Sequence, residues 1–234
     1  MHDSVATDAN PLFSSFAETK VAMQRAADLA RRQLDDIALI AVSKQQPDEK
    51  ITAALAMGHR LFGENRVQEA KERWASRRPD FPDLRLHLIG PLQSNKAAEA
   101  VALFDVIEVI DRPKIAKAVA AELAKQNKSM SCLIQVNTGL EPQKSGIAPN
   151  EIADFLAFCK GEAGLPVDGL MCIPPADEEP APHFALLAKY AKRHALPILS
   201  MGMSGDYGTA IQLGATHIRV GSALFGRRLP RAKD

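Results

Sequence analysis

Short apolar runs alternate with segments of helical period along most of the chain. Each run is followed by polar or glycine residues, and the eight runs occupy residues 37–44, 60–65, 85–90, 104–111, 131–139, 166–172, 197–202 and 216–221. Strands of near-continuous apolar character are typical of a parallel sheet covered by helices. Eight such runs, with seven clear helical segments between them, predict a single-domain (β/α)8 TIM barrel of the α/β class.

The alternative fold is an open, doubly wound parallel sheet. That fold commonly carries a Gly-x-Gly-x-x-Gly turn after its first strand. The first run here ends instead in Ser43 and Lys44. Eight repeated units without the glycine-rich turn therefore favour closure of the sheet into a barrel.

An extra helix is predicted ahead of the barrel. Apolar residues recur there at the spacing of one helical face: Phe13, Phe16, Met23, Ala27, Ala30 and Leu34. We expect a leading helix over about residues 11–35, the barrel over about 36–226 and a short basic tail over 227–234. Asn150 is the expected N-cap of the later helical segment that includes Ile152.

Composition narrows the classes of function. The 234 residues carry 29 Lys and Arg against 28 Asp and Glu, a formal net charge of +1. This balance argues against nucleic acid or an anionic membrane as a partner. No apolar run approaches the roughly 18 residues of a membrane span, and the N-terminus lacks the pattern of a secretory signal, so we expect a cytoplasmic protein.

The residues that commonly bind metals are dispersed. Cys132, Cys159 and Cys172 match neither a zinc site nor a disulfide framework, and the six histidines show no paired ligand spacing. We therefore expect reduced, mostly buried thiols and no metal site.

Lys44 is the first candidate for chemistry. In such barrels the active face lies at the carboxyl ends of the strands, and Lys44 follows six largely apolar residues. Desolvation at this position disfavours the charged ammonium, so a neutral amine becomes available to form an imine with a carbonyl compound. The alternative is an ordinary solvated lysine at a strand end.

Serine and glycine follow the last two runs. Ser204 lies after the seventh run, and Gly221 and Ser222 form the turn after the eighth. Glycines let the backbone approach a bound group, and free amides with a serine hydroxyl make an anion site, which in barrels often binds phosphate. The alternative is two plain strand-to-helix turns in which Ser204 is solely an N-cap and Gly221 solely a tight corner.

An imine-forming lysine and a phosphate site on one face indicate a phosphorylated aldehyde, for which pyridoxal 5′-phosphate (PLP) is the obvious candidate. Arg219 precedes Gly221 by two residues, so both side chains point the same way on a strand and the guanidinium can reach the pyridine nitrogen. Because arginine does not give up its proton, the ring nitrogen stays unprotonated and the cofactor is a weak electron sink. The alternative for Arg219 is an ion pair with Asp206 or Glu64.

Seven segments carry a resemblance to a known family. They are AVSKQQP (41–47), FGENRVQEA (62–70), LHLIGPLQSNK (86–96), QVNTGLEPQKSG (135–146), GLMCIPP (169–175), LSMGMSGDYGTAI (199–211) and GATHIRVGSALFG (214–226). On these segments the sequence resembles the pyridoxal phosphate homeostasis protein family, whose fold resembles the N-terminal barrel domain of bacterial alanine racemase. The matching segments cover nearly the whole chain in order.

The resemblance implies roles for individual residues. Lys44 would be the Schiff-base lysine, and Arg219 would face the ring nitrogen. The residues at the phosphate would be Ser204, Gly221 and Ser222. Near the ring or lining the pocket, the resemblance places Asn65, Met201 and Met203.

Two functions remain in competition. The resemblance implies a protein that holds and releases PLP in vitamin B6 homeostasis, with PLP-dependent apoenzymes as possible recipients and a monomeric state. The alternative is a PLP-dependent amino-acid racemase that uses Lys44 and Tyr207. In the racemase that the barrel resembles, a tyrosine from a separate C-terminal domain serves the second face of the ring; we expect no such domain here and assign no catalytic residue. A third class, a phosphate-binding barrel enzyme without PLP, requires the two signals to coincide by accident.

Three further polar motifs could belong to the site or be ordinary exposed residues. The segment 63–69 is either a polar site loop or a helix start with Glu64 and Arg66 solvated. Lys144, in a glycine- and serine-containing turn, is either part of a lid or second anion contact, or merely exposed. Lys96 either attracts a second anionic ligand or is an exposed lysine at a helix start.

Overall fold

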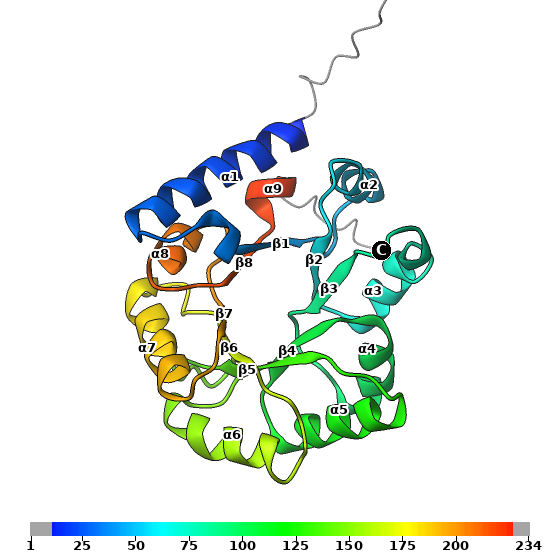
Figure 1. Cartoon of the computed structure of the whole chain (residues 1–234), viewed down its shortest axis with the longest axis vertical. Coiled ribbons are helices and arrows are strands. Elements are labelled where there is room, and N and C mark those ends of the chain that lie inside the picture. The colour runs from blue at the N-terminus through cyan, green and yellow to red at the C-terminus, as the bar shows by residue number, and fades with distance from the viewer. Residues whose placement is uncertain (1–10, 227–234) are drawn as a thin grey trace, which may run out of the picture.

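Eight parallel strands form a closed barrel in the computed structural model, which describes residues 11–226 (Figure 1). Neighbours around the ring follow the order of the chain, and β8 closes on β1. The strands are β1 Ala38–Val42, β2 Leu61–Glu64, β3 Arg85–Leu88, β4 Val106–Ile110, β5 Ser131–Val136, β6 Gly169–Cys172, β7 Ile198–Ser200 and β8 His217–Val220. Each strand lies within one of the predicted apolar runs, and the predicted barrel is confirmed.

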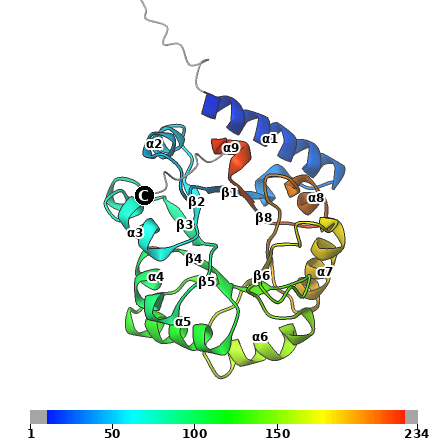
Figure 2. The ribbon, with the colours of Figure 1, turned by 180° about the vertical axis from the view of Figure 1, so that it is seen from behind.

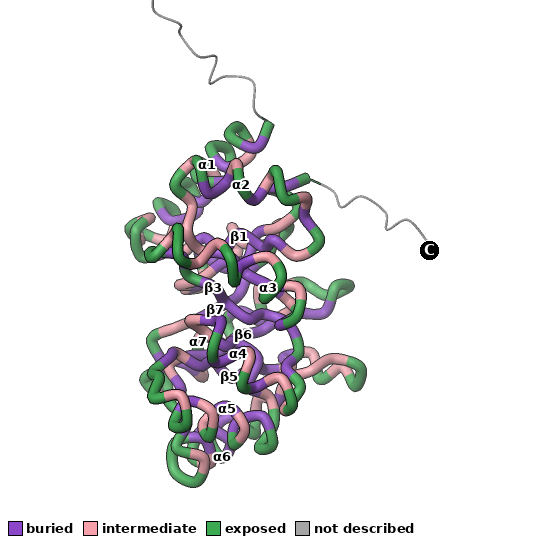
Figure 3. The backbone as a smooth tube through the Cα atoms, turned by 90° about the vertical axis from the view of Figure 1, so that its right-hand side faces the viewer, coloured by how far each residue is buried: buried purple, intermediate pink, exposed green. Residues whose placement is uncertain are grey.

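Helices surround the strands, as the views from both sides show (Figures 1 and 2). They are α1 Pro11–Leu29, α2 Asp48–Ala56, α3 Val67–Trp74, α4 Ala97–Leu103, α5 Pro113–Lys125, α6 Ile152–Lys160, α7 Pro180–Arg193, α8 Tyr207–Gln212 and α9 Ser222–Phe225. Four 3-10 turns interrupt the connections: Leu34–Asp36, Arg78–Asp80, Ser94–Lys96 and Pro149–Glu151. The main apolar core lies between the outer faces of the strands and these helices, and the tube coloured by burial shows buried strands inside a more exposed layer (Figure 3).

The leading helix differs from its prediction in length and in its buried face. It ends at Leu29, and Arg31 adopts a φ of 53°, which ends the helix before residue 35. Phe16, Met23 and Ala27 of the predicted face are buried, but at its start Leu12 is buried while Phe13 is 52% exposed. The helix packs on α8 and α9, and Arg32 donates to the Ile211 carbonyl at 2.9 Å.

The predicted N-cap of the sixth helix is wrong. Asn150 lies inside the 3-10 turn Pro149–Glu151 that precedes α6. The backbone N–H of Ala148 donates instead to the Glu151 carboxylate at 2.8 Å. Because Pro149 has a fixed φ and no N–H, the turn begins there, and the capping interaction shifts two residues towards the N-terminus.

The structure also bears on the cysteines, on membrane-spanning helices and on groups that could hold a metal ion. All three cysteines are free and buried, as expected. Burial raises the thiol pKa of Cys132 and Cys172 to about 12 and that of Cys159 to about 11. Within residues 11–226, no helix is long and apolar enough to cross a membrane, and no group of three His, Cys, Asp or Glu residues is placed to hold a metal ion. The basic tail 227–234 lies outside the described residues.

Candidate functional site

One cleft of about 320 Å³ opens where β1, β2, β7 and β8 end. Its lining consists of Val42, Lys44, Asn65, Ile89, Ile173, Met203, Ser204, Gly205, Arg219, Gly221 and Ser222. The structure therefore brings together seven of the eight residues singled out from the sequence. Met201 does not line this cleft. It is fully buried in the apolar core, because it follows the inward-facing Ser200 and the alternation of side chains turns it outward.

Lys44 lies two residues beyond β1 in a tight turn. Ser43 before it is fully buried, whereas Lys44 is half-buried and belongs to the cleft lining. The next residue, Gln45, has a φ of 58°, and the N–H of Gln46 donates back to the Ser43 carbonyl at 3.1 Å. The chain thus turns sharply around Lys44, and its amine is presented at the carboxyl end of the barrel.

A buried ion pair lies directly beneath this turn. Glu64, at the end of β2, accepts hydrogen bonds from Ser43 Oγ at 2.7 Å, Arg73 at 3.0 Å and Trp74 Nε1 at 3.0 Å, all on Oε1. Arg73 on α3 also donates to the carbonyl oxygens of Ser43 at 2.5 Å and Gln46 at 2.8 Å. The Glu64 side chain is 1% exposed, so the interpretation in which Glu64 is solvated is wrong; Arg66 is exposed, as that interpretation expected.

Asn65, directly after β2, reaches the cleft because the segment after the neighbouring strand β3 carries Gly90. A Cβ at position 90 would lie 2.4 Å from the Asn65 carbonyl oxygen, so only glycine lets the two backbones approach this closely. The buried Oδ1 of Asn65 has no hydrogen-bond partner among the described residues. Buried polar atoms are usually paired, so this oxygen has unused hydrogen-bonding capacity at the cleft.

The turns after β7 and β8 converge at Ser204. Its Oγ accepts hydrogen bonds from the backbone N–H groups of Gly221 at 3.2 Å and Ala223 at 3.3 Å. Gly202, with a φ of 92°, permits the turn, and a Cβ there would lie 2.6 Å from Ala210 of α8. Ser204 is thus not the N-cap of α8, a position that Asp206 occupies, and its hydroxyl instead joins the turn after β7 to the turn after β8 within the cleft lining. Because its oxygen accepts from these two amides, the Ser204 O–H is left as a donor at the mouth of the cleft.

Arg219 is held from inside the barrel. Its guanidinium donates to Ser200 Oγ at 2.7 Å and to the Cys172 carbonyl at 2.7 Å, and Ser200 in turn donates to Glu108 at 2.5 Å. The other Glu108 oxygen lies 2.6 Å from Nδ1 of His87. These side chains come from β3, β4, β7 and β8, so they meet across the barrel interior. Within residues 11–226 the buried acidic partner of Arg219 is thus Glu108, 4.0 Å away, and not Asp206 or Glu64.

The interior network keeps Glu108 ionised. Burial alone would raise the pKa of Glu108, but the hydrogen bond and charge of His87, the charge of Arg219 and the hydrogen bond from Ser200 outweigh it, and the pKa is lowered. His217 lies beside this network, with its ring centroid 5.6 Å from that of His87. Burial, reinforced by the charge of His87, lowers the pKa of His217 to about 4. The guanidinium at the cleft therefore has a buried carboxylate as its counter-charge.

Residues of the competing interpretations lie elsewhere. Tyr207 begins α8, packs against the core and is not among the residues that line the cleft; burial raises the pKa of its phenol. Lys144 forms an ion pair with Glu141 at 2.5 Å and donates to the Pro174 carbonyl at 3.0 Å. Lys96 pairs with Glu99 at 2.6 Å and lines a neighbouring pocket that also includes Asn65.

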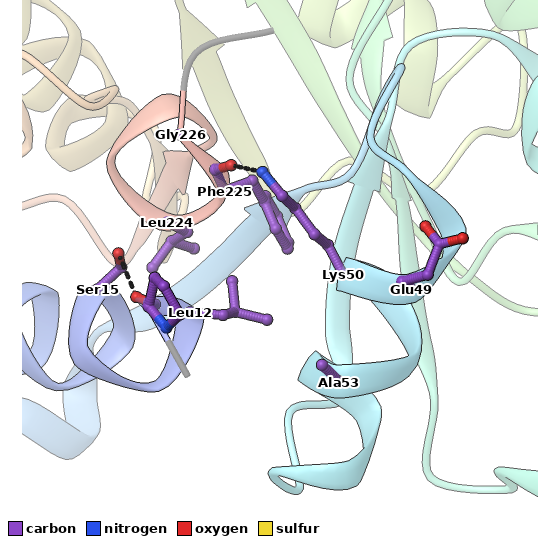
Figure 4. Close-up of a pocket in the computed structure, with 9 residues that line it drawn as sticks. Leu12, Ser15, Glu49, Lys50, Ala53, Leu224, Phe225 and Gly226 are labelled. Atoms are coloured by element: carbon purple, nitrogen blue, oxygen red, sulfur yellow. Dashed lines mark hydrogen bonds between the residues drawn. The ribbon is translucent and has the colours of Figure 1, made fainter. Parts of the chain in front are cut away.

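A second hollow, of about 400 Å³, lies between α1, α2 and α9 (Figure 4). Leu12, Ala53, Leu224 and Phe225 make much of its lining apolar. Its one lysine, Lys50, extends across the hollow and donates to the Phe225 carbonyl. This hollow lacks the combination of lysine, arginine and serine donors found in the first cleft, which argues against it as the site for a phosphorylated aldehyde.

The donor set of the first cleft fits a phosphorylated aldehyde. Backbone amides and hydroxyls around Ser204 and Ser222 suit a phosphate, and Lys44 supplies an amine. Arg219 supplies a donor for a ring nitrogen, and the unpartnered Oδ1 of Asn65 can accept from a polar ring substituent. The residues present therefore fit PLP. Together, fold and cleft define a (β/α)8-barrel protein that binds a small anionic ligand beside a lysine.

Comparison with known proteins identifies the family. The family described as "Alanine racemase, N-terminal domain" matches residues 20–229. A pyridoxal phosphate homeostasis protein from Pasteurella multocida is 37% identical over 224 residues, which span 92% of this chain and 96% of that protein. The protein of the same name from Escherichia coli K12 is 34% identical over 228 residues, 94% of this chain and 97% of that protein. The chain belongs to the family of the pyridoxal phosphate homeostasis proteins, built on the alanine racemase N-terminal domain.

Solved structures agree with this assignment. PipY of Synechococcus elongatus, determined with PLP bound, is 38% identical with a TM-score of 0.75, and the match covers 88% of this chain and 100% of PipY. An alanine racemase of Clostridium difficile shares the fold with a TM-score of 0.67 at 13% identity, and the match covers 92% of this chain but 58% of the racemase. At that identity the likeness concerns the fold alone.

Proposed function

We propose that this protein binds PLP through Lys44 and acts as a PLP carrier in vitamin B6 homeostasis. The observation that supports it best is the convergence of Lys44, Arg219 and the Ser204–Gly221 contact in one cleft. The names of the relatives, and the PLP bound to PipY, point in the same direction. When bound, PLP supplies an aldehyde carbon with which the Lys44 amine forms a C=N bond, and the aldehyde oxygen leaves as water.

The residues of the cleft divide the work of binding. Ser204 and the turn at Gly221 and Ser222 would hold the phosphate, and Arg219, which lines the same cleft, would face the ring. Arg219 would donate to the ring nitrogen, and Glu108, 4.0 Å away, is its buried counter-charge. A ring nitrogen without a proton withdraws electrons weakly, so this arrangement favours storage of the cofactor over carbanion chemistry.

The carrier is favoured over a racemase. Racemisation needs acid and base groups on both faces of the ring within hydrogen-bond reach. Lys44 serves one face, whereas Tyr207, the candidate for the other, lies outside the cleft lining. We therefore assign no catalytic residue. Free buried cysteines are typical of proteins in a reducing compartment, which supports a location in the cytoplasm. PLP-dependent apoenzymes are the proposed recipients of the cofactor. The monomeric state stays a prediction of the family resemblance.

Trapping with borohydride tests the proposal. We expect the wild-type protein with PLP to show an imine absorption band that borohydride abolishes, leaving a reduced adduct that peptide mass spectrometry locates on Lys44. Lys44→Arg, which keeps the charge but forms no stable imine, should show no such adduct. Mixing the loaded protein with a PLP-requiring apoenzyme should then restore that enzyme's activity as the band declines. An adduct on another lysine, or no transfer, contradicts the proposal.

A further inference from the structure

The turn that carries Lys44 is tied down at both of its ends. The carbonyl of Ser43, immediately before Lys44, and that of Gln46, two residues after it, both accept hydrogen bonds from the guanidinium of Arg73. The Ser43 hydroxyl donates to Glu64, and the backbone N–H of Ser43 donates to the Gly63 carbonyl at 3.1 Å. The flanking backbone thus has several partners that come from β2 and α3.

These partners are buried or largely buried. The side chain of Glu64 is 1% exposed and that of Arg73 is 17% exposed, and the indole N–H of the fully buried Trp74 donates to the same carboxylate oxygen. Breaking a buried pair leaves an uncompensated charge, so both members are held in place. A planar guanidinium with several fixed donors can bridge two carbonyls and a carboxylate at once, which a lysine ammonium cannot do with the same geometry.

The backbone of the turn requires such support. Gln45 occupies the left-handed region with a φ of 58°, a conformation that is unfavourable for residues other than glycine, asparagine and aspartate. The contacts of Arg73 with the residues on both sides of Gln45 hold this conformation. Without them, the turn would relax and carry the Lys44 amine with it.

We infer that the Glu64–Arg73 pair is a positioning device for Lys44. It holds the 43–46 turn so that the Lys44 amine is aimed into the cleft, and it takes no part in binding phosphate, which is the work of the turns after β7 and β8. Glu64 and Arg73 are absent from the cleft lining, so they act through the turn and not by touching the ligand. The inference rests on the proposed function of Lys44.

Two ligands separate positioning from binding. PLP needs both the phosphate site and the Lys44 amine, whereas pyridoxine 5′-phosphate carries an alcohol in place of the aldehyde and uses the phosphate and ring sites alone. In Arg73→Lys and Glu64→Gln, we expect the rate of imine formation with PLP to fall at least about tenfold, because misplacement of a reacting group by about an ångström has effects of that order. The dissociation constant for pyridoxine 5′-phosphate should stay within about twofold.

Arg77→Lys is the matched control. Arg77 lies on the same side of the barrel, donates to the Arg73 carbonyl at 2.6 Å and pairs with Asp48, and its guanidinium has no contact with residues 43–46 among the described interactions. It should therefore leave both measurements unchanged. If Arg73→Lys fails to fold, Ser43→Ala removes only the hydroxyl donated to Glu64 and should slow imine formation about threefold.

Each outcome separates the two hypotheses. Unchanged imine formation in folded Arg73→Lys and Glu64→Gln, or an equal loss of pyridoxine 5′-phosphate affinity, overturns the positioning role. If Arg73→Lys does not fold, unchanged imine formation in Ser43→Ala overturns it too. Failure of the wild-type protein to form the Lys44 adduct instead overturns the proposed function, whatever the variants do.

Discussion

Individual side chains at the ends of the strands are the proposed binding groups of this protein. Lys44, Ser204 and Arg219 come from three strand ends that are far apart in the sequence, and each has a neighbour that sets its direction. For Lys44 it is the Arg73 guanidinium, for Ser204 the amides of the next turn, and for Arg219 the hydroxyl of Ser200. The direction of each proposed site residue therefore depends on a second residue that holds it.

The hydroxyl of Ser204 is expected to contribute to phosphate binding and not to imine formation. In Ser204→Ala we expect PLP and pyridoxine 5′-phosphate to bind about tenfold more weakly, the loss of one hydrogen bond to a charged group. Equilibrium titrations followed by absorbance for PLP and by calorimetry for the alcohol measure this change. Ser131→Ala is the control, because the buried Ser131 Oγ has no partner among the described residues. Loss of PLP binding alone would contradict the assignment.

The strands of the barrel carry different residues on their inward and outward faces. Strands β3, β4, β7 and β8 each send a polar side chain inward: His87, Glu108, Ser200 and Arg219. The outward faces of the same strands carry apolar residues that pack against the helices. The strands thus have two separate roles, since one face builds the core and the other holds a charged network under the cleft.

The charge of Glu108 is expected to stabilise the fold and to hold Arg219. Glu108→Gln keeps the size of the side chain but leaves the buried guanidinium without its counter-charge, which should lower the free energy of unfolding by about 3 kcal/mol. Urea denaturation of the protein without PLP measures it. Glu99→Gln, which removes a carboxylate that pairs with Lys71 and Lys96 at the surface, should change the stability little. If the two substitutions lowered the free energy of unfolding equally, burial of the Glu108–Arg219 pair would have no effect on stability.

Two histidines, His59 and His217, are uncharged in the folded protein at neutral pH. Burial lowers the pKa of His59 and of His217 to about 4, well below the ordinary value of 6.5. His59 is enclosed by the rings of Phe16 and Phe62, and its Nε2 lies 2.7 Å from the Leu61 carbonyl. Protonating either ring in the folded state therefore requires charge to be placed in an apolar setting.

These shifts predict a loss of stability in mild acid. Between pH 6.5 and about 4 the unfolded rings bind protons that the folded rings do not, so stability is complete above pH 6.5 and falls towards pH 4. The loss is at most about 3 kcal/mol for each ring. Urea denaturation at about pH 7.5 and about pH 5 measures it. His59→Phe keeps a ring at that position and should reduce the pH dependence; an unchanged dependence would contradict the assignment.

Much of the barrel could be predicted because its signals are local. Each strand is a short apolar run, and the residues that line the cleft lie at or just after the ends of six of the eight runs, so both follow from neighbours in the sequence. The errors occurred where local signals were ambiguous. Phe13 and Leu12 are adjacent apolar residues, and the packing of α1 on α8 and α9 selects which one is buried. Met201 was expected in the cleft, but the alternation after Ser200 turns it into the core.

The amino-acid sequence alone determined the closed barrel, the amine at the end of the first strand and the serine and glycine turns after the last two. These depend on hydrophobic period and on residue type, which are properties of short segments. The tertiary structure decided which buried charges meet. Glu108 and Ser200 are 92 residues apart, so their contact follows from closure of the barrel. Glu64 and Arg73 are close in the sequence, and their contact depends on how α3 packs back onto the end of β2. A buried charge requires a partner, and only the folded chain shows which one it has.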